Sequence, residues 1–412
     1  MRETHDVLCA WREGRLVGEF VRGTDGRVSF RYERGAESPI SLSIPLDGTI
    51  EQEAPIRYLE ALLPEDGNQR LAMKVSIGAD STDTFDLLHA ADSAGGLVFL
   101  HEGEEPTFDH DLTPGLVATE DEIATQLELV TRSCDSWWDF EGSKSRFTLA
   151  GSQPKITISR VFGSDFWPDA NLPSTHILKP AIRRVRDVPL VEHSSMELAR
   201  AMGYEVPNNE VSSFRGVETY VIERFDRKTG PNGVVRRLVT EDLTQAIGAS
   251  AQDKYDLNLA NIVTRLRKGG MQEDELYLLM SEVAFNAYVG NGDAHAKNYS
   301  IFLDAPSPSL CPLYDILLTT CWGNAFDDSL PFEIGGILRP EELTKGDWAV
   351  EGDECGLDGS RVADEAERVA SLVRELAPDF LRESLPDRLS RAAIEAIYEN
   401  TRATCEPKWK RR

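Results

Sequence analysis

The chain has 412 residues, of which 44 are Lys or Arg and 70 are Asp or Glu, so its formal net charge is −26. Hydrophobic residues make up 41%, which excludes wholesale disorder, and the length fits roughly two to three domains. The charge argues against unaided binding to DNA, RNA or an anionic membrane, because affinity for phosphates comes mainly from Lys and Arg. It favours basic protein partners, or small anions held in a locally positive pocket.

Targeting and metal signals are absent from the sequence. The N-terminus has no apolar secretory stretch, and no window approaches the 18 or so apolar residues of a membrane span. The six cysteines form no C-x-x-C pair, and the seven histidines form no zinc spacing. We therefore expect a cytoplasmic protein with buried thiols and no structural metal.

The first hundred residues have the pattern of a small β-rich unit. Apolar runs at 7–11 and 16–20 flank a Gly14-Arg15 turn and predict a hairpin. Further strands are expected at 28–32, 40–46 and 97–100, and helices at 56–63 and 84–91. The acidic, proline-containing stretch 101–122 predicts a linker or exposed edge.

The later pattern changes from mixed to helical. We expect a strand end at Ile177–Pro180, a helix at 191–202 and a strand at 217–225. Apolar residues between 276 and 288 recur at helical spacing and predict a buried helix, and the tail 361–402 also has a helical pattern.

The strongest motif follows that buried helix, in Gly290-Asn291-Gly292-Asp293-Ala294-His295-Ala296-Lys297-Asn298. Asp293 and Asn298 are five residues apart, the separation at which phosphotransferases of the protein-kinase type place a base Asp and a metal-binding Asn. The Asp can accept or orient a hydroxyl proton, and the Asn carbonyl oxygen suits Mg²⁺. Asp315, 17 residues after Asn298, supplies a second metal carboxylate.

Candidates for the nucleotide end lie upstream. The loop from Thr148 to Lys155 has small side chains that let backbone N–H groups approach phosphate oxygens. Lys179 could hold the α- and β-phosphates, and Glu192 on the predicted helix could form an ion pair with it. Glu223-Arg224-Phe225 ends a predicted strand at a lobe junction suited to adenine.

Each element also has a plain structural interpretation. An Asp and an Asn at this spacing occur by chance in a chain of this length, and Gly290 and Gly292 could simply cap a helix. His295 fits a structural hydrogen-bonding role better than a base or ligand, and Lys179 could be a surface lysine. The order of all the elements along the chain is what favours a kinase.

These segments resemble the HipA-type serine/threonine protein kinases, the toxins of bacterial toxin–antitoxin pairs. The resemblance covers nearly the whole chain, thins after about residue 330, and lies in Leu149–Lys155, Thr175–Lys179, Val221–Arg227, Glu241–Gly248, Lys254-Tyr255, Gly292–Asn298, Leu313–Asp315 and the N-terminal region. It implies an α+β, two-lobed protein-kinase-like fold. Residues 1–110 would form an extra β-rich subdomain, 111–240 an N-lobe with the ATP-phosphate loop, and 241–412 an all-α C-lobe with the catalytic and metal residues.

The resemblance also implies a set of site residues. Asp293 would be the catalytic residue, Asn298 and Asp315 would hold Mg²⁺, and Glu192 would pair with Lys179. The residues expected to bind ATP are Ala150, Gly151, Ser152, Gln153, Pro154, Lys155, Lys179, Glu223, Arg224, Phe225, His295, Ala296, Lys297, Asn298, Tyr314 and Asp315. Thr148 and Ser152 are the candidates for autophosphorylation. The sequence departs from the family pattern at both, and at Pro154, where an acidic residue is usual.

Partners follow from the same resemblance. A HipA-type kinase would phosphorylate a protein acceptor, an aminoacyl-tRNA synthetase, to inhibit translation and growth. It would be held by a helix-turn-helix antitoxin of the HipB type, and through it by operator DNA, with no membrane and no independent nucleic-acid binding. A small-molecule phosphotransferase and a non-catalytic co-repressor scaffold are the alternatives.

Overall fold

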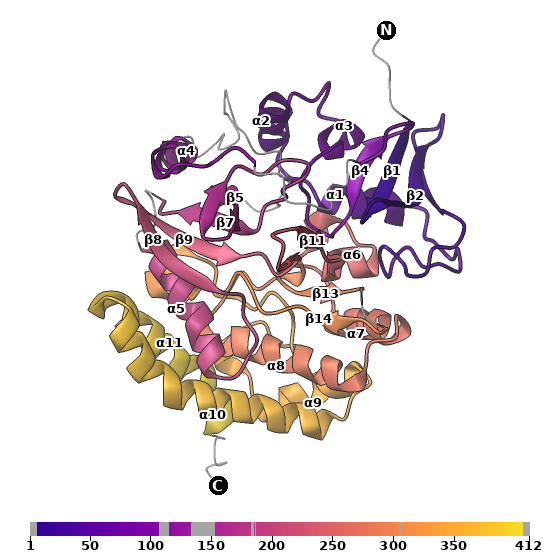
Figure 1. The fold of residues 1–412 in the computed structure, drawn as a ribbon. Helices are drawn as coiled ribbons and strands as arrows, with labels where there is room; N and C mark the ends of the chain where they lie inside the picture. Colours follow the sequence, from indigo (N-terminus) through magenta and orange to yellow (C-terminus); the bar gives the residue numbers. More distant parts are fainter. Residues whose placement is uncertain are drawn as a thin grey trace. The chain divides into compact units, whose positions relative to one another are not determined.

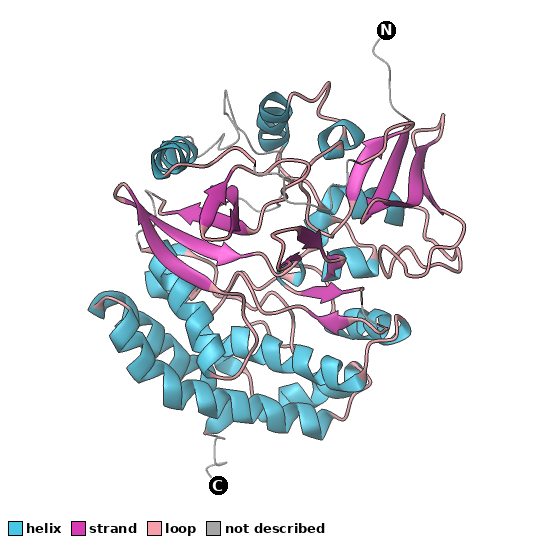
Figure 2. Cartoon of the chain, viewed as in Figure 1, coloured by secondary structure: helices cyan, strands magenta, loops and turns pink. Residues whose placement is uncertain are grey.

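A computed structural model describes residues 6–106, 115–132, 153–182, 185, 187–304 and 306–406. The chain forms two compact units. The first comprises Met1–Pro189, Asn208–Gln252 and Phe302–Asp304, and the second comprises Leu190–Pro207, Asp253–Ile301 and Ala305–Arg412. Figure 1 traces the chain through both, and Figure 2 shows that strands and helices are both abundant, which confirms the α+β class.

The first unit begins with an antiparallel sheet of order β3-β2-β1-β4. Its strands are β1 (Val7–Arg12), β2 (Arg15–Arg22), β3 (Val28–Tyr32) and β4 (Val98–His101). The predicted hairpin is confirmed, because Glu13 and Gly14 both have positive φ and form the two-residue turn that right-twisted strands favour. Phe20 on β2 packs against Phe30 and Phe99 and against Tyr58 of helix α1 (Ala54–Ala61), so this sheet has its own aromatic core.

Residues 40–46 do not form the predicted strand. The Tyr32 hydroxyl accepts from the Ile40 N–H at 2.9 Å and donates to the Ile44 carbonyl, and a side-chain oxygen of Glu241 accepts from the Leu42 N–H at 2.9 Å. Ile44 N–H closes a turn onto the carbonyl of Ser41. Side chains and a local turn therefore satisfy backbone groups that a strand would offer to a neighbour.

Two helices follow α1 before β4. The predicted helix at 84–91 is shorter, α3 (Thr84–Leu88), and α2 (Gly67–Ile77) was not expected. The α2 helix begins with Asp66, whose side chain accepts from two N–H groups of the first turn, and ends with Gly78 in the left-handed region. Leu71 and Val75 on α2 are exposed while Met73 and Ile77 are buried, so its apolar residues alternate along the sequence and do not show a helical period.

The second sheet has the order β6-β5-β7-β9-β8. Its strands are β5 (Ile156–Val161), β6 (Ser164–Phe166), β7 (His176–Pro180), β8 (Asn209–Phe214) and β9 (Val217–Glu223), and all their pairings are antiparallel. The strand end expected at Ile177–Pro180 and the strand expected from 217 are confirmed. The first unit also contains α4 (Glu120–Arg132), β10 (Arg227–Thr229), β11 (Val235–Arg237), β12 (Thr240–Asp242) and α6 (Leu243–Ile247).

The second unit is mainly helical. Its helices are α5 (Val188–Ala201, which begins in the first unit), α7 (Leu259–Lys268), α8 (Glu273–Val289), α9 (Lys345–Glu354), α10 (Gly359–Ser384) and α11 (Asp387–Cys405). Short strands β13 (Ser300–Phe302) and β14 (Ser309–Leu310) are neighbours. The predicted helix at 276–288 is confirmed, and it is buried on nearly every side, as expected of the central helix of a helical unit.

The helical tail is confirmed as two helices. The chain is extended at Leu385, and Pro386 then caps the start of α11, since proline has no N–H to donate to the ladder of α10. Helices α10 and α11 lie side by side (Figure 1). Within the described residues, no helix is long and apolar enough to cross a membrane.

Candidate active site

The loop Gly290–Asn298 begins where α8 ends. Gly290 has a φ of +78°, and the N–H groups of Gly290 and Asn291 donate to carbonyls of the last helical turn at 3.3 and 3.0 Å. At Gly292, a Cβ would lie 2.3 Å from the carbonyl oxygen of Asp327. One glycine therefore caps the helix, and the other lets two backbone segments approach closely.

The backbone of Asp293 is held by its own loop. Its carbonyl accepts from the N–H of His295 and from Nδ2 of Asn298, both at 2.8 Å, and its N–H donates to Oδ1 of Asn291 at 3.3 Å. The side chain of Asp293 is 57% exposed. The peptide is therefore fixed, while the carboxylate is open to solvent.

Asn298 is placed to offer a carbonyl oxygen. It ends a short 3₁₀ turn, Ala296–Asn298, and is buried. Its amide nitrogen is committed to the Asp293 carbonyl, so the carbonyl oxygen Oδ1 is the atom of this amide that suits a cation. The five-residue spacing thus has a structural basis, because one hydrogen bond closes the loop between Asp293 and Asn298.

Asp315 follows a segment that is tied to the same loop. The hydroxyl of Tyr314 donates to the carbonyl of Lys297 and pairs with Oγ of Ser300, both at 2.7 Å. Asp315 has a φ of +56°, an uncommon conformation for a residue other than glycine and one that often marks a functional site. Its half-buried side chain is close enough to His295 to act on the pKa of that imidazole.

The donor set suits a hard cation better than a zinc-type metal. Among the described residues there is no group of three or more His, Cys, Asp or Glu side chains able to hold a metal ion. Mg²⁺ typically takes one or two carboxylates together with substrate phosphates and water. The amide oxygen of Asn298 and the carboxylate of Asp315 fit that pattern.

His295 is buried and neutral. Burial, followed by the positive charge of Lys254, lowers the pKa of His295 to about 4. Its Nδ1 is buried and has no hydrogen-bond partner within the described part of the chain. This burial agrees with the structural role that the sequence favours for His295. The hydrogen bond that orders the loop is made by the backbone N–H of His295 and not by its ring.

Tyr255 was not recognised as a site residue from the sequence. Its hydroxyl donates to Oδ1 of Asp293 at 2.5 Å, and its ring meets the ring of His295 edge-on, with centroids 4.9 Å apart. The Lys254-Tyr255 pair was part of the resemblance, but 38 residues separate Tyr255 from Asp293, and no local pattern connects them.

Two predicted lysines flank the paired strands β5 and β7 of the first unit. Ile156 on β5 pairs with Leu178 on β7, Lys155 directly precedes Ile156, and Lys179 directly follows Leu178. Both lysines are buried, and the ammonium of Lys179 lies 5.9 Å from the centre of the Tyr220 ring. Nε2 of Gln153 is buried with no hydrogen-bond partner among the described residues. Two buried cations and an orphaned amide donor suit an anionic ligand such as a polyphosphate.

Comparison with known families assigns the chain. The HipA-like C-terminal domain matches residues 147–377, and the HipA N-terminal domain matches residues 8–100. The first match alone spans more than half of the chain. The chain belongs to the HipA family.

Relatives of this HipA-family chain extend over most of its length. A protein of Sinorhizobium fredii described as a kinase is 31% identical over 85% of this chain and 86% of its own. The serine/threonine-protein kinase toxin HipA of Shewanella oneidensis is 28% identical over 89% of this chain and 87% of its own. A structure of the Shewanella oneidensis HipA, HipB and operator DNA complex has a chain with a TM-score of 0.78 and 22% identity, covering 96% of this chain and 97% of that one. This likeness confirms the two-lobed kinase-like fold.

Three residues of this HipA-family chain are predicted to contact adenine, and the side chain of one of them, Arg224, is bonded to Asp226 instead. Glu223 ends β9 and accepts from Nδ2 of Asn208 at 2.8 Å, and Phe225 packs edge-on against Phe302. The guanidinium of Arg224 is buried and bonded to Asp226 at 2.7 Å. For Arg224, the backbone and not the side chain is therefore the candidate for contact with a nucleotide.

Arg224 belongs to a buried ionic cluster that the sequence did not reveal. The cluster consists of Asp92, Arg224, Asp226, Arg227 and Arg237, all in the first unit. Burial alone would raise the pKa of Asp92, but the neighbouring arginines, Arg227 first, hold it well below the usual range. Three guanidinium groups share two carboxylates, so the cluster carries a net charge of about +1.

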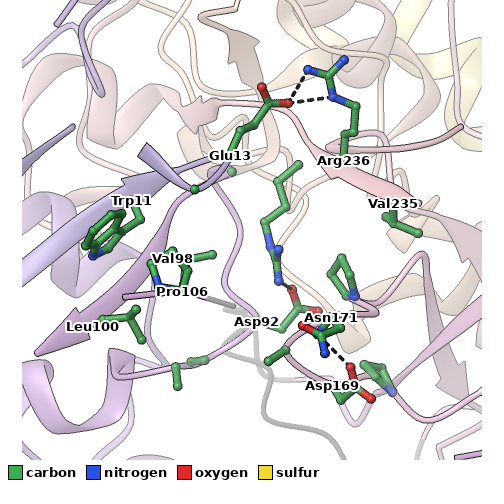
Figure 3. A pocket seen from close by; sticks show the side chains of 18 of the residues that line it. Trp11, Glu13, Asp92, Val98, Leu100, Pro106, Asp169, Asn171, Val235 and Arg236 are labelled. Carbon is green, nitrogen blue, oxygen red and sulfur yellow. Dashed lines mark hydrogen bonds and ion pairs between the residues drawn. The ribbon is translucent and has the colours of Figure 1, made fainter. Parts of the chain in front are cut away.

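The cluster borders a cavity of about 690 Å³ within the first unit (Figure 3). Trp11, Val98 and Leu100 form an apolar wall, and Glu13 pairs with Arg236 at its rim. Asp92 lies among the lining residues. None of the predicted nucleotide or metal residues that the structure describes lines this cavity.

The remaining predicted residues are placed as follows. Glu192 is buried on α5 in the second unit, and Pro154 is buried just before β5. Ala296 and Lys297 are buried in the 3₁₀ turn. Thr148, Ala150, Gly151 and Ser152 lie outside the described residues.

Proposed function

We propose that this HipA-family chain is an ATP- and Mg²⁺-dependent serine/threonine protein kinase. The observation that carries the proposal is the closed Asp293–Asn298 loop. One hydrogen bond from the Asn298 amide fixes the Asp293 peptide, and Tyr314 ties the Asp315 segment to the same loop. A base Asp, an amide oxygen and a second carboxylate are the parts that phosphoryl transfer requires of the protein.

The chain's own residues act by positioning and electrostatics. Asp293 orients the acceptor hydroxyl in line with the γ-phosphoryl group and takes up its proton. Asn298 and Asp315 would hold Mg²⁺, which when bound supplies positive charge to the phosphate oxygens. Lys155, Lys179 and Gln153 would hold the phosphates of ATP, together with Ala150, Gly151, Ser152 and Pro154.

Other parts of the nucleotide site follow from the family. Glu223, Phe225 and the backbone of Arg224 would contact adenine, and His295, Ala296, Lys297 and Tyr314 would line the site. Glu192 would pair with Lys179. Thr148 or Ser152 would be the autophosphorylated residue.

The relatives support proposals on partners and setting. The related toxin's structure contains HipB and operator DNA, so we propose a helix-turn-helix antitoxin as partner, with DNA contact made through it. A net charge of −26 supports this route, because the chain itself repels DNA. The proposed acceptor is an aminoacyl-tRNA synthetase in the cytoplasm, whose phosphorylation would inhibit translation and growth.

Transfer of labelled phosphate tests the proposal. The purified chain is incubated with labelled ATP, Mg²⁺ and a bacterial lysate, and in parallel with sugars and aminoglycosides as small acceptors. Wild type should label a protein band, while Asp293→Asn and Asp315→Ala should lose at least about a hundredfold in rate with unchanged circular dichroism. Labelling of small acceptors alone would indicate a small-molecule phosphotransferase, and undiminished transfer by both variants would refute the site.

A further inference from the structure

Tyr255 contacts the catalytic loop from a separate segment of the second unit. It lies between the 3₁₀ turn Ala251–Asp253 and α7. Its hydroxyl donates to Oδ1 of Asp293 at 2.5 Å, within the range of short, charge-assisted hydrogen bonds to a carboxylate. Its ring meets the imidazole of His295 edge-on at 84°. Two residues of the loop therefore contact one tyrosine side chain.

The position of Tyr255 does not depend on its hydroxyl. The N–H of Ala296 donates to the carbonyl of Lys254 at 3.2 Å, which joins the two segments through their backbones. The ammonium of Lys254 lies 5.4 Å from the centre of the Tyr255 ring. Removing the hydroxyl should therefore leave the ring and the loop in place.

The direction of the Asp293 carboxylate depends on the contacts of its side chain. Hydrogen bonds hold its peptide, the side chain is 57% exposed, and its Oδ1 lies 4.0 Å from Nε2 of His295 in addition to its hydrogen bond with Tyr255. A phenol hydroxyl on Oδ1 selects one orientation of this carboxylate. Transfer to an acceptor hydroxyl requires the base in one orientation, and a misplacement of about 1 Å can cost on the order of a hundredfold in rate.

We propose that Tyr255 is a positioning residue that fixes the carboxylate of Asp293 for the acceptor hydroxyl. This inference rests on the proposed kinase function. Tyr255 touches neither the phosphates nor the metal ligands in this account, so it should affect turnover and leave nucleotide binding unchanged.

The test compares Tyr255→Phe with Tyr398→Phe, a matched loss of one exposed tyrosine hydroxyl on α11 of the same unit. Steady-state transfer of labelled phosphate to the protein acceptor gives kcat and the KM for ATP, and calorimetry gives the affinity for Mg-ATP. Tyr255→Phe should lower kcat about tenfold to a hundredfold, with both nucleotide constants within about twofold of wild type. Tyr398→Phe should match wild type in all three.

Three outcomes would overturn the inference. They are a kcat for Tyr255→Phe within twofold of wild type, a higher kcat, or a loss confined to the KM for ATP. If wild type transfers phosphate and Tyr255→Phe equals it, only this inference fails. If wild type transfers none to any acceptor, the proposed function itself fails.

Discussion

The buried ionic cluster of the first unit makes a sharp prediction about stability. In Asp92→Asn, a neutral amide replaces a carboxylate that accepts from Arg227 at 2.9 Å and from the N–H and hydroxyl of Ser174 at 2.9 and 2.5 Å. Arg224 and Arg237 each lie 3.6 Å from the same carboxylate. The change keeps the size of the side chain and leaves three arginines facing one Asp.

The expected cost is large because the charges are buried. Breaking a buried ion pair by removing one partner typically costs about 3–5 kcal/mol in unfolding free energy. For a unit of this size, that corresponds to a fall of about 6–20 °C in melting temperature. The matched control is Glu19→Gln, which breaks an exposed pair with Arg31 at 3.0 Å and should cost less than about 1 kcal/mol.

Thermal melts followed by circular dichroism measure both variants. A melting temperature of Asp92→Asn within 2 °C of wild type, or a loss no larger than that of Glu19→Gln, would refute the claim that this carboxylate offsets buried positive charge.

Three further predictions concern the loop, acid stability and the lysines. Gly292→Ala places a methyl group 2.3 Å from the Asp327 carbonyl and should cost about 1–3 kcal/mol in denaturant unfolding, and an unchanged midpoint would contradict this close contact. The pKa of Asp92 is lower in the folded state, so the stability that its carboxylate contributes is complete above the unfolded pKa of about 3.9 and is lost as pH falls toward the folded value. Wild type should therefore lose stability below about pH 5 more steeply than Asp92→Asn. Parallel pH profiles of the two proteins would contradict a lowered pKa for Asp92. Lys179→Met should weaken Mg-ATP binding at least about tenfold by calorimetry, whereas Lys228→Met, on an exposed position of β10, should not; equal affinities in the two variants would exclude Lys179 from the phosphate site.

Local pattern predicted the elements whose residues are buried with a regular period. The β1–β2 hairpin and helix α8 follow from apolar spacing and turn residues, and the order of Asp293, Asn298 and Asp315 pointed to a kinase-like loop. The sequence also predicted the strand end at Ile177–Pro180 that includes Lys179.

Features that depend on contacts distant in sequence could not be predicted. Helix α2 exposes Leu71 and Val75 and buries Met73 and Ile77, so its apolar residues alternate in the sequence and do not indicate a helix. Asp92 meets Arg227 across 135 residues, and Tyr255 meets Asp293 across 38. Local periodicity cannot predict either contact, because only the folded chain brings these side chains together.

Calorimetric titration of ATP measures whether Asp315 holds Mg²⁺ for the nucleotide. ATP is titrated into wild type, Asp315→Asn and the exposed-residue control Asp328→Asn, with Mg²⁺ and then with excess chelator. We predict that Mg²⁺ strengthens ATP binding at least about tenfold in wild type and in Asp328→Asn, and that Asp315→Asn loses this gain. No binding of ATP by wild type, or binding that is the same with and without Mg²⁺ in all three proteins, would contradict the account.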